Sequence, residues 1–191
     1  MEGGSLDNLV KGNGSFPEAV IGRIAFQVLT GLDYLHARKI VHCDIKPANL
    51  LIDKHMNVKI GDFGVSSKIT GLEDPCKTYA GTCAYMGPER YDPYTYGGNA
   101  FAGDVWSLGL TLMEMYIGYY PYLKPGQKEE STALMFEICM EEPPSLPDHA
   151  SESFRDFTQC CLQKESAKRW SASQLLSHPF VLSGRSKCSS N

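Results

Sequence analysis

Hydrophobic residues recur at steps of three and four between residues 17 and 39, a spacing that places them along one side of a helix. The residues on this side are Ile21, Ile24, Val28, Leu32 and Leu35. Pro17 suits the first turn of a helix, because its fixed φ angle is helical and the N–H that it lacks would be unpaired there anyway. The pattern predicts a helix over residues 17–39.

A different pattern at residues 104–116 predicts a second long helix, because apolar side chains occur there on all sides. These side chains are Val105, Trp106, Leu108, Leu110, Leu112, Met113 and Met115. A helix that is apolar all round is typically buried in a core. Residues 132–141, 152–163 and 172–177 predict three further helices. Ser171, followed three residues later by a glutamine, is typical of a capping box before the last of them.

The predicted strands are few and short. Apolar residues 50–52 and 58–60 flank the polar segment 53–57, a pattern that indicates a small β-hairpin. Residues 62–96 show no periodicity and contain many Gly, Pro and Tyr residues. A segment of this length without a pattern is usually functional or disordered. The chain is therefore expected to be mainly α, of the α+β class.

Composition excludes several classes of protein. With 191 residues the chain forms one large domain or two small ones. Its net charge of −4, without a basic block, argues against nucleic-acid binding. No apolar run is long enough to span a membrane, and the first residues carry no secretory signal. Seven cysteines, an odd number without zinc-site spacing, indicate free thiols in a reducing compartment. We expect a cytoplasmic location, with the nucleus as an alternative, and neither a membrane nor a nucleic acid as partner.

Four side chains suited to chemistry follow the apolar residues 40–41. Asp44 can accept a proton as a general base, and Lys46 places a positive charge two residues from it. Asn49 and Asp62 offer hard oxygen atoms of the kind that bind Mg²⁺. Alone, Asp44 and Asn49 are more readily interpreted as caps of a turn. Together, in this order and with a hairpin before Asp62, the four residues favour a chemical role over turn capping.

Two stretches, His42-Cys43-Asp44-Ile45-Lys46-Pro47-Ala48-Asn49 and Asp62-Phe63-Gly64, resemble the catalytic loop and the metal-binding motif of protein kinases. Gly87-Pro88-Glu89 resembles the motif that ends the activation segment of these enzymes. Residues 104–109 resemble their buried central helix, and similar motifs continue to about Phe180. The resemblance implies the large lobe of a protein kinase, helical with a small β-hairpin, and with the small N-terminal β-rich lobe absent.

The resemblance also implies a role for each candidate residue. Asp44 would be the catalytic base, and Lys46 would stabilise the transferred phosphoryl group. Asn49 would belong to the same catalytic loop and, with Asp62, would hold Mg²⁺. Lys46, Asn49 and Asp62 would together contact the nucleotide cofactor. ATP and Mg²⁺ are therefore the expected cofactors.

Three structural roles follow from the same resemblance. His42 is expected to be a core histidine rather than a proton shuttle. Asp104 is expected to anchor the catalytic loop. Arg169 is expected to pair with Glu89 of the motif that ends the activation segment.

Among protein kinases, the chain is similar to the MAP kinase kinases, and to the plant-type members in particular. Residues 1–6, Gly64-Val65-Ser66 and residues 81–90 carry this likeness, and Lys46 is typical of Ser/Thr rather than tyrosine kinases. The likeness implies a dual-specificity Ser/Thr/Tyr kinase in a signalling cascade. Its substrate would be a MAP kinase, and its upstream activator a MAP kinase kinase kinase.

The regulatory residues depart from the family pattern. Cys43 stands where most such kinases carry an arginine that meets a phosphorylated loop residue, and a thiol supplies no fixed cation. Thr78 fits the second of the two regulatory phosphorylation positions of plant-type members. The first position is Leu72, and the nearest hydroxyl group is that of Thr70. Activation by phosphorylation of Thr78 and Thr70 is therefore an open prediction.

The family's Gly-rich loop, strand lysine and helix glutamate have no counterpart in the 191 residues. We expect residues 1–182 to form the large lobe, beginning at the hinge, and residues 183–191 to form a flexible tail. Three interpretations stay open. The chain is an active kinase or part of one, a catalytically inactive truncated or pseudokinase fragment that acts as a binding or decoy module, or the translation of an incomplete gene model. Without clamping of the nucleotide, we expect weak activity or none.

Overall fold

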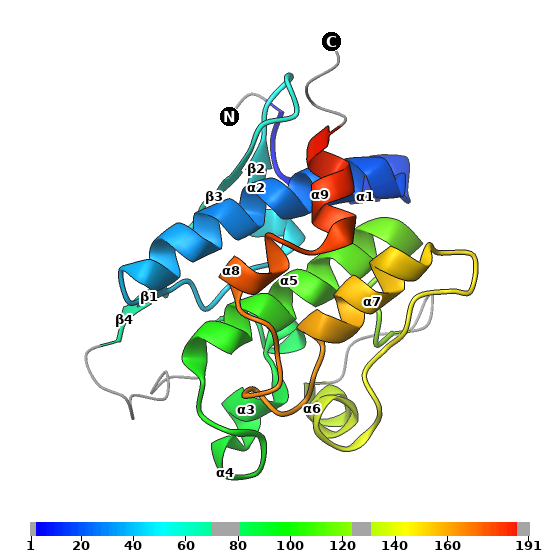
Figure 1. Cartoon of the computed structure of the whole chain (residues 1–191). Coiled ribbons are helices and arrows are strands. Elements are labelled where there is room, and N and C mark those ends of the chain that lie inside the picture. Colours follow the sequence, from blue (N-terminus) through cyan, green and yellow to red (C-terminus); the bar gives the residue numbers. More distant parts are fainter. Residues whose placement is uncertain (1–2, 70–80, 124–130, 187–191) are drawn as a thin grey trace.

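Helix α5 (Ala100–Ile117) lies at the centre of the computed structural model, which describes residues 3–69, 81–123 and 131–186 (Figure 1). All its residues from Ala102 to Met113 are buried. Helices α2 (Glu18–Ala37) and α7 (Glu152–Cys161) both pack against it. The buried helix that the all-round apolar pattern predicted is therefore confirmed.

Helix α2 confirms the helix that was predicted over residues 17–39, with Pro17 as its N-cap and Ala37 as its last residue. Its apolar stripe is buried, and α9 (Pro179–Ser186) lies across it (Figure 1). The two helices approach closely at Gly22 and Gly184, because a Cβ atom on Gly184 would collide with the Gly22 backbone.

The close contact between α2 and α9 also corrects the expected end of the lobe. The sequence predicted a flexible tail from residue 183, but α9 continues through Ser186. Gly184 lies inside the contact with α2 and is buried. Packing against α2 therefore holds residues 183–186 in the helix.

The other predicted helices are present, with ends within two residues of the predicted ones. They are α6 (Ser131–Met140), α7 and α8 (Ala172–Leu175). The capping box before α8 is confirmed: the Ser171 hydroxyl accepts the Gln174 N–H at 3.3 Å, and the Gln174 side chain accepts the Ser171 N–H at 2.8 Å. The shorter helices of the described residues are α1 (Leu6–Asn13), η1 (Pro47–Asn49), η2 (Cys83–Tyr85), α3 (Pro88–Tyr91) and α4 (Pro93–Tyr96).

The strands form two antiparallel pairs at one side of the helices (Figure 1). β2 (Leu50–Ile52) and β3 (Val58–Ile60) make the predicted hairpin, with Leu50 opposite Ile60. In its turn, the Asp53 carboxylate accepts the N–H groups of His55 and Asn57. β1 (Ile40–Val41) pairs with β4 (Ser67–Lys68), a pairing that the sequence pattern did not indicate.

Within the described residues, no helix is both long and apolar enough to cross a membrane. The cysteines of this part of the chain, which are Cys43, Cys83, Cys139, Cys160 and Cys161, are free thiols, as the sequence predicted. The fold class is also confirmed: the described residues are mainly helical, with few short strands and a small hairpin.

Candidate active site

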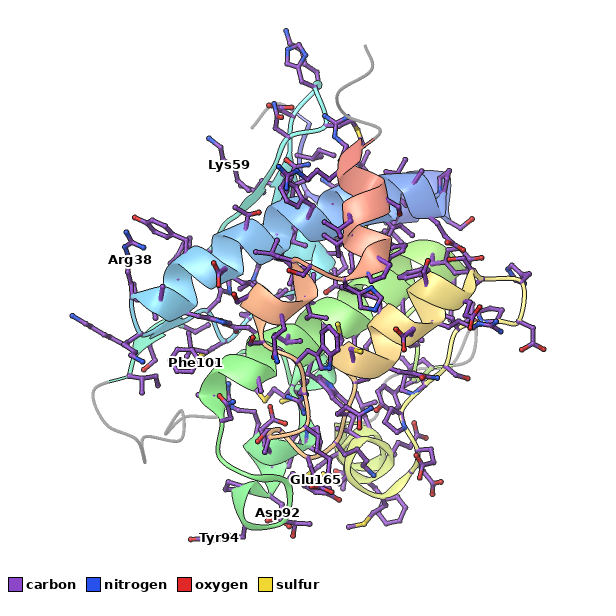
Figure 2. The ribbon with its side chains drawn as sticks, in the orientation of Figure 1. Arg38, Lys59, Asp92, Tyr94, Phe101 and Glu165 are labelled. Atoms are coloured by element: carbon purple, nitrogen blue, oxygen red, sulfur yellow. The ribbon has the colours of Figure 1, made fainter. Side chains whose placement is uncertain are left out.

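Asp104 of α5 fixes the backbone of the loop that follows β1. Its carboxylate is 1% exposed and accepts the N–H groups of His42 and Cys43, each at 2.9 Å. His36 of α2 contacts the same carboxylate at 2.9 Å, and its ring packs on Phe101. Figure 2 labels Phe101 near the start of α5. These contacts stabilise a loop in which Cys43 has a φ angle of 69°, a conformation that costs roughly 1 kcal/mol or more for a residue with a side chain. The expected anchoring by Asp104 is therefore confirmed.

His42 is a structural residue of this loop, as predicted. It is fully buried, its Nδ1 accepts the N–H of Asp44 at 3.3 Å, and its Nε2 lies 3.0 Å from the carbonyl oxygen of Gly61. With Nδ1 as acceptor, the neutral ring carries its proton on Nε2 and donates it to Gly61. Both nitrogens are thus engaged with the backbone, and the ring ties the catalytic loop to the end of β3.

The Asp44 carboxylate is surrounded by donors. One oxygen accepts the N–H of Thr82 at 2.8 Å, and the other accepts Nδ2 of Asn49 at 2.7 Å and Nζ of Lys46 at 2.8 Å. Burial by itself would raise the pKa of Asp44, but the contacts with Lys46 and Thr82 outweigh burial and lower the pKa below its usual value. Asp44 is therefore ionised at neutral pH, the form that a general base requires.

Lys46 and the segment that begins at Gly81 complete the surroundings of Asp44. The Lys46 ammonium group contacts both the Asp44 carboxylate and the Thr82 hydroxyl. Gly81 has a φ angle of 116°, and a Cβ atom at this position would collide with the carbonyl oxygen of Cys43. Only glycine can bring the segment this close in this conformation, so Gly81 positions Thr82 against Asp44.

Asn49 and Asp62 come from opposite ends of the hairpin. Asn49, in η1, is 7% exposed, and its Nδ2 also donates to the backbone carbonyl of Asp44 at 2.8 Å. The Asn49 carbonyl accepts the N–H of Gly61 at 2.8 Å, which holds the residue before Asp62 against η1. Asp62 is exposed, and its φ angle of 56° is one that Asp tolerates better than most residues.

The donor set of Asn49 and Asp62 fits a magnesium ion. Since Nδ2 of Asn49 is used by Asp44, the side chain has its oxygen left to face a cation. One Asp62 oxygen accepts the Gly64 N–H at 3.2 Å, which leaves the second oxygen available. Amide and carboxylate oxygens are ligands that Mg²⁺ prefers. The exposed position of Asp62 also allows access for a hydrated ion with its nucleotide phosphates.

Cys43 is buried in this loop. Its thiol lies 3.8 Å from the carbonyl oxygen of Val41. A thiol offers no guanidinium fork, so this position cannot bind a phosphorylated residue as an arginine does. The two candidate phosphorylation sites, Thr70 and Thr78, lie outside the described residues.

The segment after Thr82 is held by a buried ion pair, as the sequence predicted. Arg169 donates to both oxygens of Glu89, at 2.8 and 3.0 Å, and both side chains are almost fully buried. Arg169 also donates to the carbonyl oxygens of Gln163 and Ala102. In this bidentate geometry, hydrogen bonds pair the buried charge of Arg169 with that of Glu89. The pair therefore joins α3 and the start of α5 to the loop before α8.

Sequence reasoning missed two sets of contacts, one at Asp44 and one between η2 and α5. Thr82 was recognised as part of a motif, but its hydrogen bonds to Asp44 and Lys46 were not foreseen. Tyr85 of η2 donates its hydroxyl to Glu114 of α5, which lies partly buried behind the same segment. Burial raises the pKa of Glu114, and the negative charge of Asp7 adds to this effect. A polar residue inside an apolar helix pattern was the only signal in the sequence.

A cluster of possible metal ligands also escaped the sequence analysis, which found no zinc-site spacing. Atoms of Asp156, Cys160 and His178 lie within 4.8 Å of one another. However, Nδ1 of His178 accepts the Phe180 N–H at 3.2 Å, so Nε2 carries the proton and donates it to Asp156 at 3.0 Å. Burial and the charge of Asp156 raise the pKa of the Cys160 thiol. These contacts indicate that the cluster stabilises the start of α9 rather than binding a metal ion.

Comparisons with known proteins agree with this geometry. Residues 1–181 match the protein kinase domain family. The chain is 50% identical over 183 residues to mitogen-activated protein kinase kinase 9 and 48% identical over 182 residues to mitogen-activated protein kinase kinase 7, both from Arabidopsis thaliana. Each match covers 95% of this chain and 58% of the relative. Mitogen-activated protein kinase kinase 1c from Physcomitrium patens is 42% identical over 186 residues, covering 95% of this chain and 53% of its own. The chain thus spans somewhat more than half the length of these relatives.

Proposed function

The chain belongs to the protein kinase family, and we propose that it supplies the base and the Mg²⁺-binding residues for ATP-dependent phosphorylation of a MAP kinase. Its likeness to plant MAP kinase kinases supports this substrate and a dual specificity for Thr and Tyr. The observation that carries the proposal is the Asp44 carboxylate, which is ionised and held by Thr82, Asn49 and Lys46.

In this proposal Asp44 accepts the proton of the substrate hydroxyl as that oxygen bonds to the terminal phosphorus of ATP. The bond between this phosphorus and the bridging oxygen breaks, and ADP leaves. A general base of this kind contributes roughly 10²–10⁴-fold to the rate. Lys46, 2.8 Å from the same carboxylate, places its charge where negative charge develops on the transferred group. Asn49 and Asp62 would hold Mg²⁺. When bound, Mg²⁺ neutralises charge on the phosphate oxygens.

Regulation by a MAP kinase kinase kinase is part of the proposal, with Thr78 and Thr70 as candidate phosphorylation sites. Cys43 changes what such phosphorylation can do, because the catalytic loop has no arginine at this position to bind a phosphate group. We therefore propose that any activating effect of phosphorylation is weaker than in relatives that carry the arginine.

A second candidate function is a non-catalytic one, in which the chain binds a MAP kinase or an upstream kinase as a decoy. Cys43 favours it, because loss of the phosphate-binding arginine weakens the coupling between the activation segment and the catalytic loop. The intact surroundings of Asp44 favour the enzyme.

A transfer assay separates the two functions. The chain is joined at residue 1 to the small lobe of a MAP kinase kinase, and transfer of labelled phosphate from ATP to an inactive MAP kinase is measured. We expect transfer with the Asp44 protein and a loss of about 10²–10⁴-fold for Asp44→Asn. Asp148→Asn is the matched control, because Asp148 is fully exposed and far from the base in sequence. Equal rates for Asp44 and Asp44→Asn, or no transfer in either, would favour the decoy.

A further inference from the structure

Three positively charged side chains gather at the end of α2, where the chain enters β1. Arg38 and Lys39 are consecutive, and Lys68 of β4 lies opposite Ile40, the residue that follows Lys39. All three charged side chains are exposed. They are flanked by two aromatic rings, one from α2 and one from the start of α5. We call this surface the basic patch, and its residues are Tyr34, Arg38, Lys39, Lys68 and Phe101.

Neighbouring carboxylates do not neutralise the basic patch. In the part of the chain that the structure describes, Lys11, Lys46 and Arg169 each form an ion pair with a carboxylate, whereas the three cations of the patch form none. The chain as a whole carries a net charge of −4, so an unpaired group of three cations stands out from the rest of it. The patch is therefore a place where the chain can attract an anionic partner.

Lys39 has a backbone conformation that disfavours a lysine. Its φ angle of 60° lies in the left-handed region, directly after the C-cap of α2. Glycine or asparagine usually occupies such a position, because other side chains are strained there. A cation at the end of a helix does interact favourably with the helix dipole. However, this interaction does not account for Lys68, which lies in a strand. The strain at Lys39 indicates that its charge has a role at the surface.

The cations of the patch point in different directions. The Arg38 guanidinium lies back along α2, 3.5 Å from the centroid of the Tyr34 ring. The Lys39 ammonium lies 5.8 Å from the centroid of Phe101, at the start of α5. Figure 2 shows Arg38 and Phe101 at separate points along one edge of the lobe. A single phosphate ion is best bound by donors that converge on it, whereas a spread surface fits an extended segment with several anionic groups.

Arg38 is already held in a geometry suited to binding. Its Nη1 donates to the carbonyl oxygen of Tyr34 at 3.2 Å, and the guanidinium stacks on the Tyr34 ring, which is 57% exposed. This hydrogen bond uses one of the five N–H donors of the side chain, so the others are available to a carboxylate. An arginine that is held in place before binding loses less conformational entropy when a partner arrives.

A membrane or a nucleic acid fits the patch less well than a protein segment does. Both are extended polyanions, and they would also approach the rest of the chain, whose net charge is −4. Recognition of anionic lipids typically takes a cluster of about four to eight basic residues, and the patch has three. A short acidic segment of a protein can contact the patch alone.

We propose that the basic patch binds an acidic segment of a partner protein, in which several Asp or Glu residues stand close together. The inference goes beyond the proposed function, because none of the residues of the patch is assigned to phosphoryl transfer. β1 precedes the loop that carries Asp44, and β4 follows Asp62. A partner on the patch therefore contacts the strands on either side of the catalytic residues.

The test measures binding of a short fluorescent peptide of alternating Asp and Ser residues to the 191-residue chain by fluorescence anisotropy. The control probe has Asn in place of each Asp. We expect the acidic peptide alone to bind, with an affinity that falls as salt is added. The triple variant, Arg38→Gln with Lys39→Gly and Lys68→Gln, should weaken binding by about 10- to 100-fold and lose most of the salt dependence.

A matched control removes one positive charge elsewhere. Lys54 is exposed and forms no ion pair among the described residues. It lies in the turn between β2 and β3, which Figure 1 shows well away from the β1–β4 pair. Lys54→Gln should bind the peptide like the unchanged chain, whereas the single variant Lys68→Gln should bind it more weakly.

Lys39→Gly separates binding from folding. Glycine accepts the left-handed conformation at this position without strain, so the midpoint of urea unfolding should not fall. Binding of the acidic peptide should weaken all the same, because the charge is gone. A lower midpoint together with unchanged binding would show that the lysine serves the fold, and it would overturn the proposal.

Other outcomes assign the patch differently. The proposal is overturned when the acidic peptide does not bind the unchanged chain, or when Lys54→Gln weakens binding as much as Lys68→Gln. Phosphatidylserine vesicles or double-stranded DNA that bind more tightly than the peptide, and no longer bind the triple variant, would assign the patch to a membrane or a nucleic acid. Tighter peptide binding by Glu73→Gln with Asp74→Gln would assign it to acidic residues of the chain itself, which lie outside the described residues.

Discussion

The catalytic loop and the outer face of α6 belong to the same lobe but are stabilised in opposite ways. Around the loop, the carboxylates of Asp44 and Asp104 are buried, and each accepts hydrogen bonds from at least two donors. On α6, Phe136 and Met140 are apolar and more than half exposed. One region therefore places charge inside, and the other places apolar side chains outside.

The difference shows which of these side chains have their interactions satisfied within the chain. The charges of the loop are satisfied within the chain, by backbone N–H groups and by Lys46 and Asn49. Such a network is costly to disturb, since every donor that loses its acceptor stays buried. The exposed apolar side chains of α6, Phe136 and Met140, contribute little to folding, because they stay in contact with water. Their removal should therefore change stability little.

The largest expected effect is that of Asp104→Ala. The substitution leaves the N–H groups of His42 and Cys43 buried without an acceptor, at about 1–3 kcal/mol for each group. We expect the free energy of unfolding, measured in urea, to fall by roughly 2–6 kcal/mol. Asp148→Ala, at a fully exposed aspartate, is the control and should change it by less than about 0.5 kcal/mol. Equal effects of the two substitutions would refute the difference between buried and exposed charge.

The next effect concerns the pH dependence of Asp44. Its pKa is lowered in the folded protein, so its ionised form adds stability above the unfolded pKa of about 3.9, and this is lost as the pH falls through the folded pKa. The stability of the unchanged chain relative to Asp44→Asn should therefore be constant above about pH 5 and shrink below about pH 4. Urea unfolding of both proteins at a series of pH values measures this difference in stability. A difference that grows toward acid would contradict the donors assigned to Asp44.

Glu114 should show the opposite slope. Burial raises its pKa, partly offset by the Tyr85 hydroxyl, so its contribution is fully present below the unfolded pKa of about 4.3 and is lost as the pH rises through the folded pKa. Relative to Glu114→Gln, the unchanged chain should therefore lose stability as the pH rises above about 4. The same urea series gives the measurement. A flat difference would show that Glu114 is hydrated in solution.

The smallest effect is expected for Phe136→Ser on α6. Because the ring is 58% exposed, the free energy of unfolding should change by less than about 0.5 kcal/mol. Phe157→Ala, at a fully buried ring of α7, is the contrast and should cost about 3–5 kcal/mol. Thermal and urea unfolding of both variants give the comparison. A loss above about 1.5 kcal/mol for Phe136→Ser would mean that the ring is packed in solution.

Much of the fold could be predicted from the sequence, because it depends on local periodicity. The stripe of α2, the all-round apolar pattern of α5 and the hairpin at residues 50–60 are properties of neighbouring residues. The site residues Asp44 and Asp62 were found in the same way, from their order and spacing along the chain. Their participation in phosphoryl transfer stays a prediction.

The remaining features could not be predicted, because they depend on contacts between distant residues. The N–H of Thr82 reaches Asp44 across 38 positions, and Arg169 reaches Glu89 across 80. No local sequence pattern indicates contacts between residues so far apart, although the resemblance to kinases implied the pair of Arg169 and Glu89. The expected tail from residue 183 was wrong for a related reason: contact with Gly22 of α2 extends α9.

By itself, the sequence determined which segments become helices or hairpin and which residues can act as base and cation ligands, since both follow from residue type and short-range spacing. Only the tertiary structure decided that Thr82 and Lys46 lower the pKa of Asp44 and that Phe136 and Met140 of α6 face outward. The physical reason is common to both. A pKa and an exposed fraction depend on what surrounds a side chain, and packing brings those surroundings from other parts of the chain.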